Sequence, residues 1–260
     1  ASWTRQLAQQ QGDPAGTLAR AADGYLAEAR ACGRGTTWLS HLANRADAIK
    51  AADEYDPLDR IAAKNILSLL RTWTAKNQSE LDTAAAGLTQ TKFKPYEAGL
   101  KALGHYCGAS ESWEAGGAQA APDSTWIFND ALWVCWEAKS EARQDSVIAT
   151  AKVREANGHL RFVEGRRGAA SPAGSFTCFA TPQTQIDASA KAVCEESVFH
   201  VAAHEPADLL AHLNRALASA RRLGPTVDEA GVLASLRAES CLPSQWSARL
   251  VAQPLRSLGE

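Results

Sequence analysis

The sequence predicts a mixed α/β protein in which a sheet is flanked by helices and preceded by an all-helical N-terminal region. Residues 1–90 are rich in Ala, Leu, Arg and Gln and poor in β-branched residues, which favours helices throughout. Residues 91–223 alternate helical stripes with short aromatic and β-branched runs, in the order α-β-β-β-α-β-β-α. Residues 224–260 follow a Gly-Pro break and are expected to form a helical C-terminal tail.

The clearest helix of the first ninety residues is expected from Pro57 to Trp73, because its apolar residues recur on one side. Asp56 suits the N-cap of this helix, and Pro57 suits its first position. The nearby acidic residues Asp53 and Glu54 fit a solvated cap better than a cation site.

The central region is expected to hold three helices and five strands. The helices are Pro95 to Cys107, Gln144 to Val163 and Pro206 to Leu223, and the strands are Ser112 to Glu114, Thr125 to Phe128, Leu132 to Trp136, Phe176 to Thr181 and Val198 to Ala202. Four of the eight Trp residues (113, 126, 133 and 136) lie in this stretch, so we expect it to form the core.

Charged residues stand at the open end of the predicted hairpin. Asp123 precedes the first strand, and Glu137 and Lys139 end the second strand on one face, because side chains alternate along a strand. A two-residue turn would place Asp123 opposite Trp136, facing away from Glu137. A shared face therefore predicts a three-residue loop, such as 129–131, or a bulge.

This charged set suits the hydrolysis of a phosphodiester. Two carboxylates and a backbone carbonyl form a hard oxygen site for Mg²⁺, for which Mn²⁺ can substitute, and such an ion activates water. We expect Asp123, Glu137 and the carbonyl of Ala138 to bind the metal. Lys139 is expected to orient the water or offset charge on the phosphate.

The helix after the hairpin offers candidates for contact with DNA. Lys152 and His159 lie on one stripe of that helix, and Arg161 follows. The alternative is an ordinary solvated helix face. The net charge of −2 is mild evidence against a free-standing DNA binder, which is usually basic.

The spacing of these residues resembles a known motif. Pro122-Asp123 followed by Glu137-Ala138-Lys139 is similar to the PD-(D/E)xK motif of the restriction-endonuclease-like nucleases, and the element order of residues 91–223 is similar to their core. Members commonly add an acidic residue from the preceding helix, where Glu97 is the matching residue. Some carry a Gln in the later helix, whereas Glu155 stands there in this chain.

The resemblance extends to nuclease regions of bacterial phage-defence and DNA-processing proteins, which are often fused or partnered to helicases. It implies a Mg²⁺-dependent DNA endonuclease with a helicase-type partner or fused domain. Two alternatives stay open. The near-neutral charge and the helical extension favour a catalytically silent interaction module, although the intact Asp, Glu and Lys disfavour it. An RNase with the same chemistry is the third reading.

The remaining composition sets the expected context. Six scattered Cys without a CxxC pair favour a reducing, cytoplasmic setting, and no apolar run is long enough to span a membrane. A zinc site at Cys194, His200 and His204 is disfavoured, because ligand spacing is lacking. The absence of Met and the start at Ala1 suggest a fragment of a longer protein, and a homo-oligomer is possible.

Overall fold

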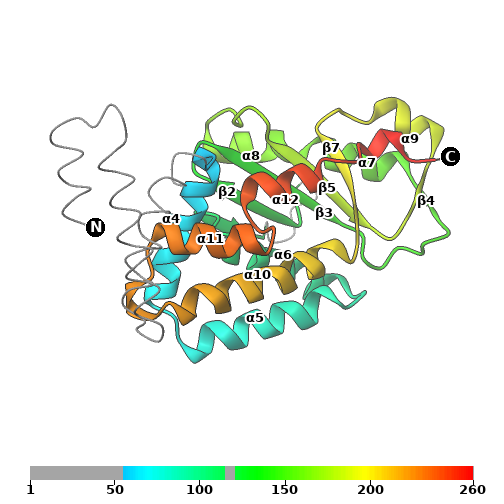
Figure 1. Ribbon diagram of the computed structural model, residues 1–260. Coiled ribbons are helices and arrows are strands. Elements are labelled where there is room, and N and C mark those ends of the chain that lie inside the picture. The colour runs from blue at the N-terminus through cyan, green and yellow to red at the C-terminus, as the bar shows by residue number, and fades with distance from the viewer. Residues whose placement is uncertain (1–54, 115–120, 260) are drawn as a thin grey trace, which may run out of the picture. The chain divides into compact units, whose positions relative to one another are not determined.

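The computed structural model describes residues 55–114 and 121–259. These residues form one compact unit that contains a mixed sheet flanked by helices (Figure 1). The helices expected before residue 55 lie outside the described residues.

The sheet has five strands in the order β1-β2-β3-β5-β7. They are β1 (Glu111–Trp113), β2 (Ser124–Phe128), β3 (Leu132–Ala138), β5 (Phe176–Thr181) and β7 (Val198–Ala202). The pairs β1–β2 and β2–β3 are antiparallel, and β3–β5 and β5–β7 are parallel. All five predicted strands are present, with β3 extended to include the candidate Glu137.

The segment after the hairpin differs from its prediction as one helix over residues 144–163. It contains a short strand, β4 (Val147–Ile148), which pairs in parallel with β6 (Gln185–Ile186). The helices α7 (Thr150–Asn157) and α8 (His159–Arg167) then follow, separated by Gly158. Sequence periodicity does not predict β4 and β6, because two residues are too few to show an alternation.

One face of the sheet is covered by a large group of helices (Figure 1). They are α4 (Pro57–Arg71), α5 (Ala75–Leu88), α6 (Phe93–Tyr106), α10 (Glu205–Arg222), α11 (Glu229–Ala238) and α12 (Pro243–Leu250). Asp56 caps α4 as predicted, since its carboxylate accepts a hydrogen bond of 2.8 Å from the Leu58 amide, and Pro57 begins the helix. Residues 57–88 and 229–250 thus share one hydrophobic core with the sheet.

The opposite face carries α7, α8 and the short helix α9 (Ala188–Val193). Val163 of α8 packs there against Ile127, Trp133 and Cys135. Two single 3₁₀ turns, η1 (Gly224–Thr226) and η2 (Leu255–Ser257), complete the elements that the structure describes. Both sheet faces are therefore buried, as the long apolar strands require.

The β2–β3 register confirms the predicted odd loop. Phe128 pairs with Leu132 and Ser124 with Trp136, which leaves a loop of three residues, Asn129 to Ala131. Asn129 has a φ of +49°, a left-handed conformation that Asn tolerates better than most residues. Continuing the register beyond Ser124 places residue 123 beside Glu137, on the face that α8 covers.

Two further features of the described residues accompany this fold. The five cysteines among them are buried and free, while Cys32 lies outside. No helix of residues 55–114 and 121–259 combines the length and apolarity that a bilayer crossing requires.

Candidate active site

The end of the β2–β3 hairpin brings Asp123, Glu137 and Lys139 together. The Asp123 backbone amide donates a hydrogen bond to the Trp136 carbonyl oxygen at 2.8 Å. The side-chain Oδ2 of Asp123 accepts a hydrogen bond from the Ala138 backbone amide at 2.6 Å. The Lys139 Nζ lies 4.0 Å from that Oδ2 and contacts Glu137 Oε1. The two carboxylates therefore face one ammonium group from neighbouring strands.

The ammonium group of Lys139 lies among the oxygens that the sequence assigns to a metal. Its Nζ is 3.3 Å from the Ala138 carbonyl oxygen, in addition to its contacts with Asp123 and Glu137. These carboxylate and carbonyl oxygens are hard donors of the kind that Mg²⁺ and Mn²⁺ select. The Lys139 ammonium already balances the negative charge of the two carboxylates. The same oxygens are therefore arranged around a positive charge, which fits a metal cation.

Glu137 is held between two partners. Its side chain is 4% exposed, and Oε2 lies 2.7 Å from His159 Nε2. Burial acts to raise the pKa of Glu137, but the His159 hydrogen bond and the Lys139 ammonium outweigh it and lower the pKa. Oε1 is buried and, apart from the Lys139 contact, has no aligned hydrogen-bond donor within the described ranges. An ion at this oxygen would satisfy it.

The pKa values of Asp123 and Lys139 are shifted by burial and by their charged neighbours. Burial and repulsion from Glu137 raise the pKa of Asp123, against the Ala138 amide hydrogen bond and the nearby Lys139. Burial acts to lower the pKa of Lys139, but Glu137 and Asp123 overcome it and raise the pKa. The lysine is thus a permanent cation at neutral pH, and Asp123 would ionise more readily beside an added positive charge.

Glu97 joins the site from α6. Burial and the neighbouring Asp123 and Glu114 raise its pKa from 4.5 to about 7, with Lys139 opposing and Glu137 adding to the rise. The charges of Asp123, Glu137 and Lys139 therefore all act on the pKa of Glu97. No three Asp, Glu, His or Cys side chains converge as a metal-binding group anywhere in the described part of the chain, so Glu97 does not complete such a group here.

We expect the raised pKa of Glu97 to make the stability of the folded protein depend on pH. Its folded-state pKa of about 7 exceeds the ordinary 4.5, so the folded protein holds a proton that the unfolded chain releases. The free energy of unfolding therefore falls as the pH rises from 4.5 to about 7. Glu97→Gln should raise the melting temperature in EDTA at about pH 8 and leave it nearly unchanged at about pH 4. An equal gain at both pH values would contradict this assignment.

The candidate DNA contacts are arranged differently from their prediction. Lys152 pairs with Glu155 at 2.8 Å, and Arg161 pairs with Glu195 at 2.7 Å, both at exposed positions. His159 is 1% exposed. A ring so buried cannot contact a DNA phosphate in this arrangement, which corrects the placement of His159 on a solvated stripe. His159 lies on the same buried side of α7 and α8 as Val153, Ala156 and Val163, because Gly158 keeps helical dihedral angles (φ −80°, ψ −13°) and the helical spacing continues across it. The exposed stripe drawn through Lys152 therefore does not include His159.

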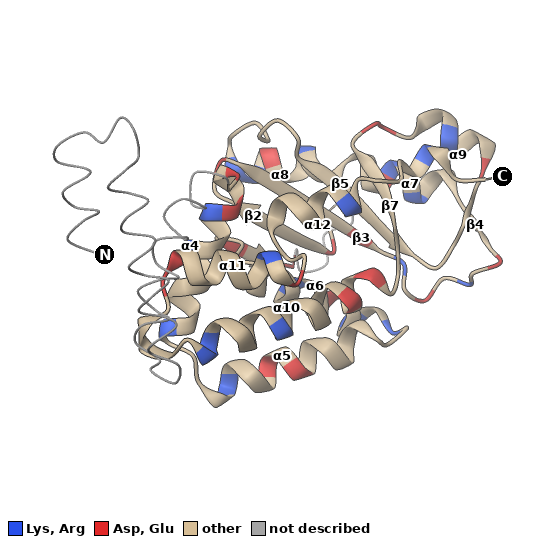
Figure 2. Ribbon diagram, viewed as in Figure 1, with Lys and Arg blue, Asp and Glu red and all other residues tan. Residues whose placement is uncertain are grey.

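Positive charge is not gathered over one surface in the view of Figure 2. Along α10 the acidic residues stand in the first turn and basic residues in the last, and both signs also occur in the region of α7 and α9. This agrees with the net charge of −2. Contacts between the described basic residues and nucleic-acid phosphates would thus be confined to a small area.

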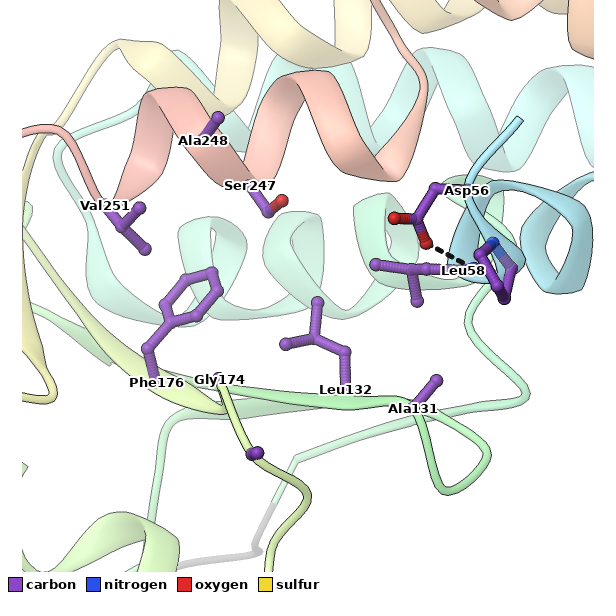
Figure 3. A pocket seen from close by; sticks show the side chains of 11 residues that line it. Asp56, Leu58, Ala131, Leu132, Gly174, Phe176, Ser247, Ala248 and Val251 are labelled. Atoms are coloured by element: carbon purple, nitrogen blue, oxygen red, sulfur yellow. Dashed lines mark hydrogen bonds between the residues drawn. The ribbon is translucent and has the colours of Figure 1, made fainter. Parts of the chain in front are cut away.

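A pocket of about 340 Å³ lies away from these charges (Figure 3). It is lined by the start of α4, the β2–β3 loop and α12. Leu132 lines it at the first position of β3, whereas Glu137 lies near the last. Its acidic residue, Asp56, already caps α4. The pocket is therefore separate from the candidate active site.

Comparison with known proteins identifies no relative: no family model, curated protein or solved structure matches this chain.

Proposed function

We propose that this chain is a metal-dependent nuclease that hydrolyses phosphodiester bonds of DNA, with Asp123, Glu137 and Lys139 at its centre. The observation that carries the proposal is the convergence of two carboxylates and one carbonyl on the Lys139 ammonium. A scaffold has no physical need to bury Glu137 beside a second carboxylate, because each buried charge carries a desolvation cost.

The element order supports the restriction-endonuclease-like fold for residues 91–223. From α6 the chain runs through the antiparallel β1, β2 and β3, then through α7 and α8 to β5, which pairs in parallel with β3. Pro122-Asp123 directly precedes β2 and Glu137-Ala138-Lys139 stands at the end of β3. The charges of these residues also act on the pKa of Glu97 on α6. Each of these features matches what the resemblance implies.

The residues would divide the chemistry between them. Asp123, Glu137 and the Ala138 carbonyl would hold a Mg²⁺ ion, which when bound supplies a lowered pKa for water and a positive charge for the phosphate. Lys139 would leave its carboxylate partners for the attacking water or the phosphate oxygens, where its charge offsets the one that develops. Glu97, with its raised pKa, is suited to exchange a proton near neutral pH.

The biological setting is a further part of this proposal. The similarity to nuclease regions of phage-defence and DNA-processing proteins suggests a helicase-type partner or a fused domain. The net charge of −2 supports such an arrangement, because another component would supply most of the affinity for DNA.

The direct test is cleavage by the purified chain. Supercoiled and linear DNA, single-stranded DNA and a matched RNA are incubated with Mg²⁺ or Mn²⁺. We expect DNA to be cut, EDTA to abolish the reaction and excess Mg²⁺ to restore it. Preferred cutting of the RNA would identify an RNase. Absence of cleavage together with absence of Mn²⁺ binding would establish the silent interaction module instead.

A further inference from the structure

His159 is a buried residue that the proposed mechanism has not used. It is the first residue of α8, directly after Gly158, and its ring lies beneath the end of β3. Nε2 is 2.7 Å from Glu137 Oε2. Since an ionised carboxylate only accepts hydrogen bonds, the Nε2 of His159 must carry the proton and donate it.

The second ring nitrogen of His159 makes no comparable contact. Nδ1 is buried and has no hydrogen-bond partner within residues 55–114 and 121–259. A histidine that served only to tie α8 to its neighbours would be expected to use both nitrogens, because an unpaired buried polar atom carries a cost. Here the polar contact of the ring is directed to one atom of one carboxylate.

We infer that His159 is a positioning residue that fixes the Glu137 carboxylate for a divalent cation, an inference that rests on the proposed nuclease function. With Oε2 held by the imidazole, Oε1 contacts the Lys139 ammonium, which also lies 3.3 Å from the Ala138 carbonyl oxygen and 4.0 Å from Asp123 Oδ2. A carboxylate free to rotate would offer this oxygen in the required direction only part of the time. Outer hydrogen bonds of this kind commonly change metal affinity roughly 10- to 100-fold.

Three substitutions separate positioning from mere packing. His159→Gln places an amide donor close to the position of Nε2, whereas His159→Asn is one methylene shorter and cannot reach Glu137. Val163→Ala is the matched control, since Val163 lies four residues further along α8, is fully buried and packs against Trp133 and Cys135. It loses core packing without touching Glu137.

The readout is Mn²⁺ binding to the full chain, followed by electron paramagnetic resonance of the free ion and by calorimetry. We expect His159→Asn to weaken Mn²⁺ binding roughly 10- to 100-fold, His159→Gln to recover most of that loss, and Val163→Ala to stay within about twofold of the parent. Circular dichroism and melting curves establish which variants fold, and the Gln and Asn pair is compared at equal folded fraction.

The outcomes are distinct. If His159→Asn binds Mn²⁺ as tightly as His159→Gln, the positioning role is wrong while the nuclease proposal stands. The same holds if Val163→Ala loses as much affinity as His159→Asn, because the effect is then one of packing. A parent chain that binds no Mn²⁺ removes both proposals together.

Discussion

Asp123→Asn is expected to abolish DNA cleavage and Mn²⁺ binding together, with cleavage reduced on the order of 100- to 1000-fold or more. The substitution keeps the size of the side chain and the oxygen that accepts from the Ala138 amide, but removes its negative charge. The remaining carboxylate, Glu137, would have to hold a divalent ion nearly alone.

Lys139→Met is expected to reduce DNA cleavage without reducing Mn²⁺ binding. Cleavage is expected to fall by a similar factor, because no cation replaces the lysine at the phosphate. Mn²⁺ binding should persist or become tighter, since the ammonium that contacts Glu137 and lies 4.0 Å from Asp123 no longer competes for their oxygens. Single-turnover cleavage and Mn²⁺ titration of the same preparations provide the measurement.

Lys152→Met is the matched control for this pair. It also removes one positive charge, but from an exposed ion pair with Glu155 on α7. We expect at most a small loss of cleavage and no change in Mn²⁺ affinity. If Asp123→Asn cuts DNA as well as the parent, the assignment of the active site is wrong.

Gly104→Ala is expected to destabilise the fold by about 3 kcal/mol, the upper part of the usual range for an overpacked core. A Cβ at this position of α6 would lie 2.6 Å from Cγ of Trp126, with two other atoms of the indole closer still. Trp126 cannot give way, because it is fully buried, its Nε1 donates to the Leu100 carbonyl at 2.9 Å, and its ring packs 4.8 Å from that of Trp136.

Gly165→Ala is the control for Gly104→Ala. Gly165 lies within α8 at an exposed position, and a Cβ there meets nothing within 4 Å. Alanine should stabilise this helix by roughly 0.5–1 kcal/mol through its higher helix propensity. Urea denaturation gives both free energies of unfolding. Equal values for the two variants would show that α6 can move away from the sheet.

Much of the sheet could be derived from local patterns. Short aromatic and β-branched runs marked β2, β3, β5 and β7. In β2, β3 and β5 the residues are buried on both faces, which leaves continuous apolar stretches. The alternation along β3 predicted that Glu137 and Lys139 share a face. The requirement for an odd loop followed from arithmetic, and the three-residue loop after Phe128 confirms it.

Other features depended on contacts between distant parts of the chain. Two-residue strands such as β4 exist because another segment, β6, pairs with them, and no periodicity announces such a pairing. Residues 57–88 were expected to form a separate helical region. Their helices, α4 and α5, pack into the same core as the sheet, and an amphipathic stripe does not reveal what it packs against.

The sequence by itself determined which charged residues share one face at the end of the hairpin, because strand alternation and the Asp, Glu and Lys spacing are local properties. Tertiary structure alone decided how those groups are held. The packing of α8 against β3 brings His159 to Glu137, 22 residues away in the chain. The raised pKa of Glu97 likewise requires burial beside Asp123. Desolvation and hydrogen bonding across the core depend on the complete fold, so spacing cannot predict them.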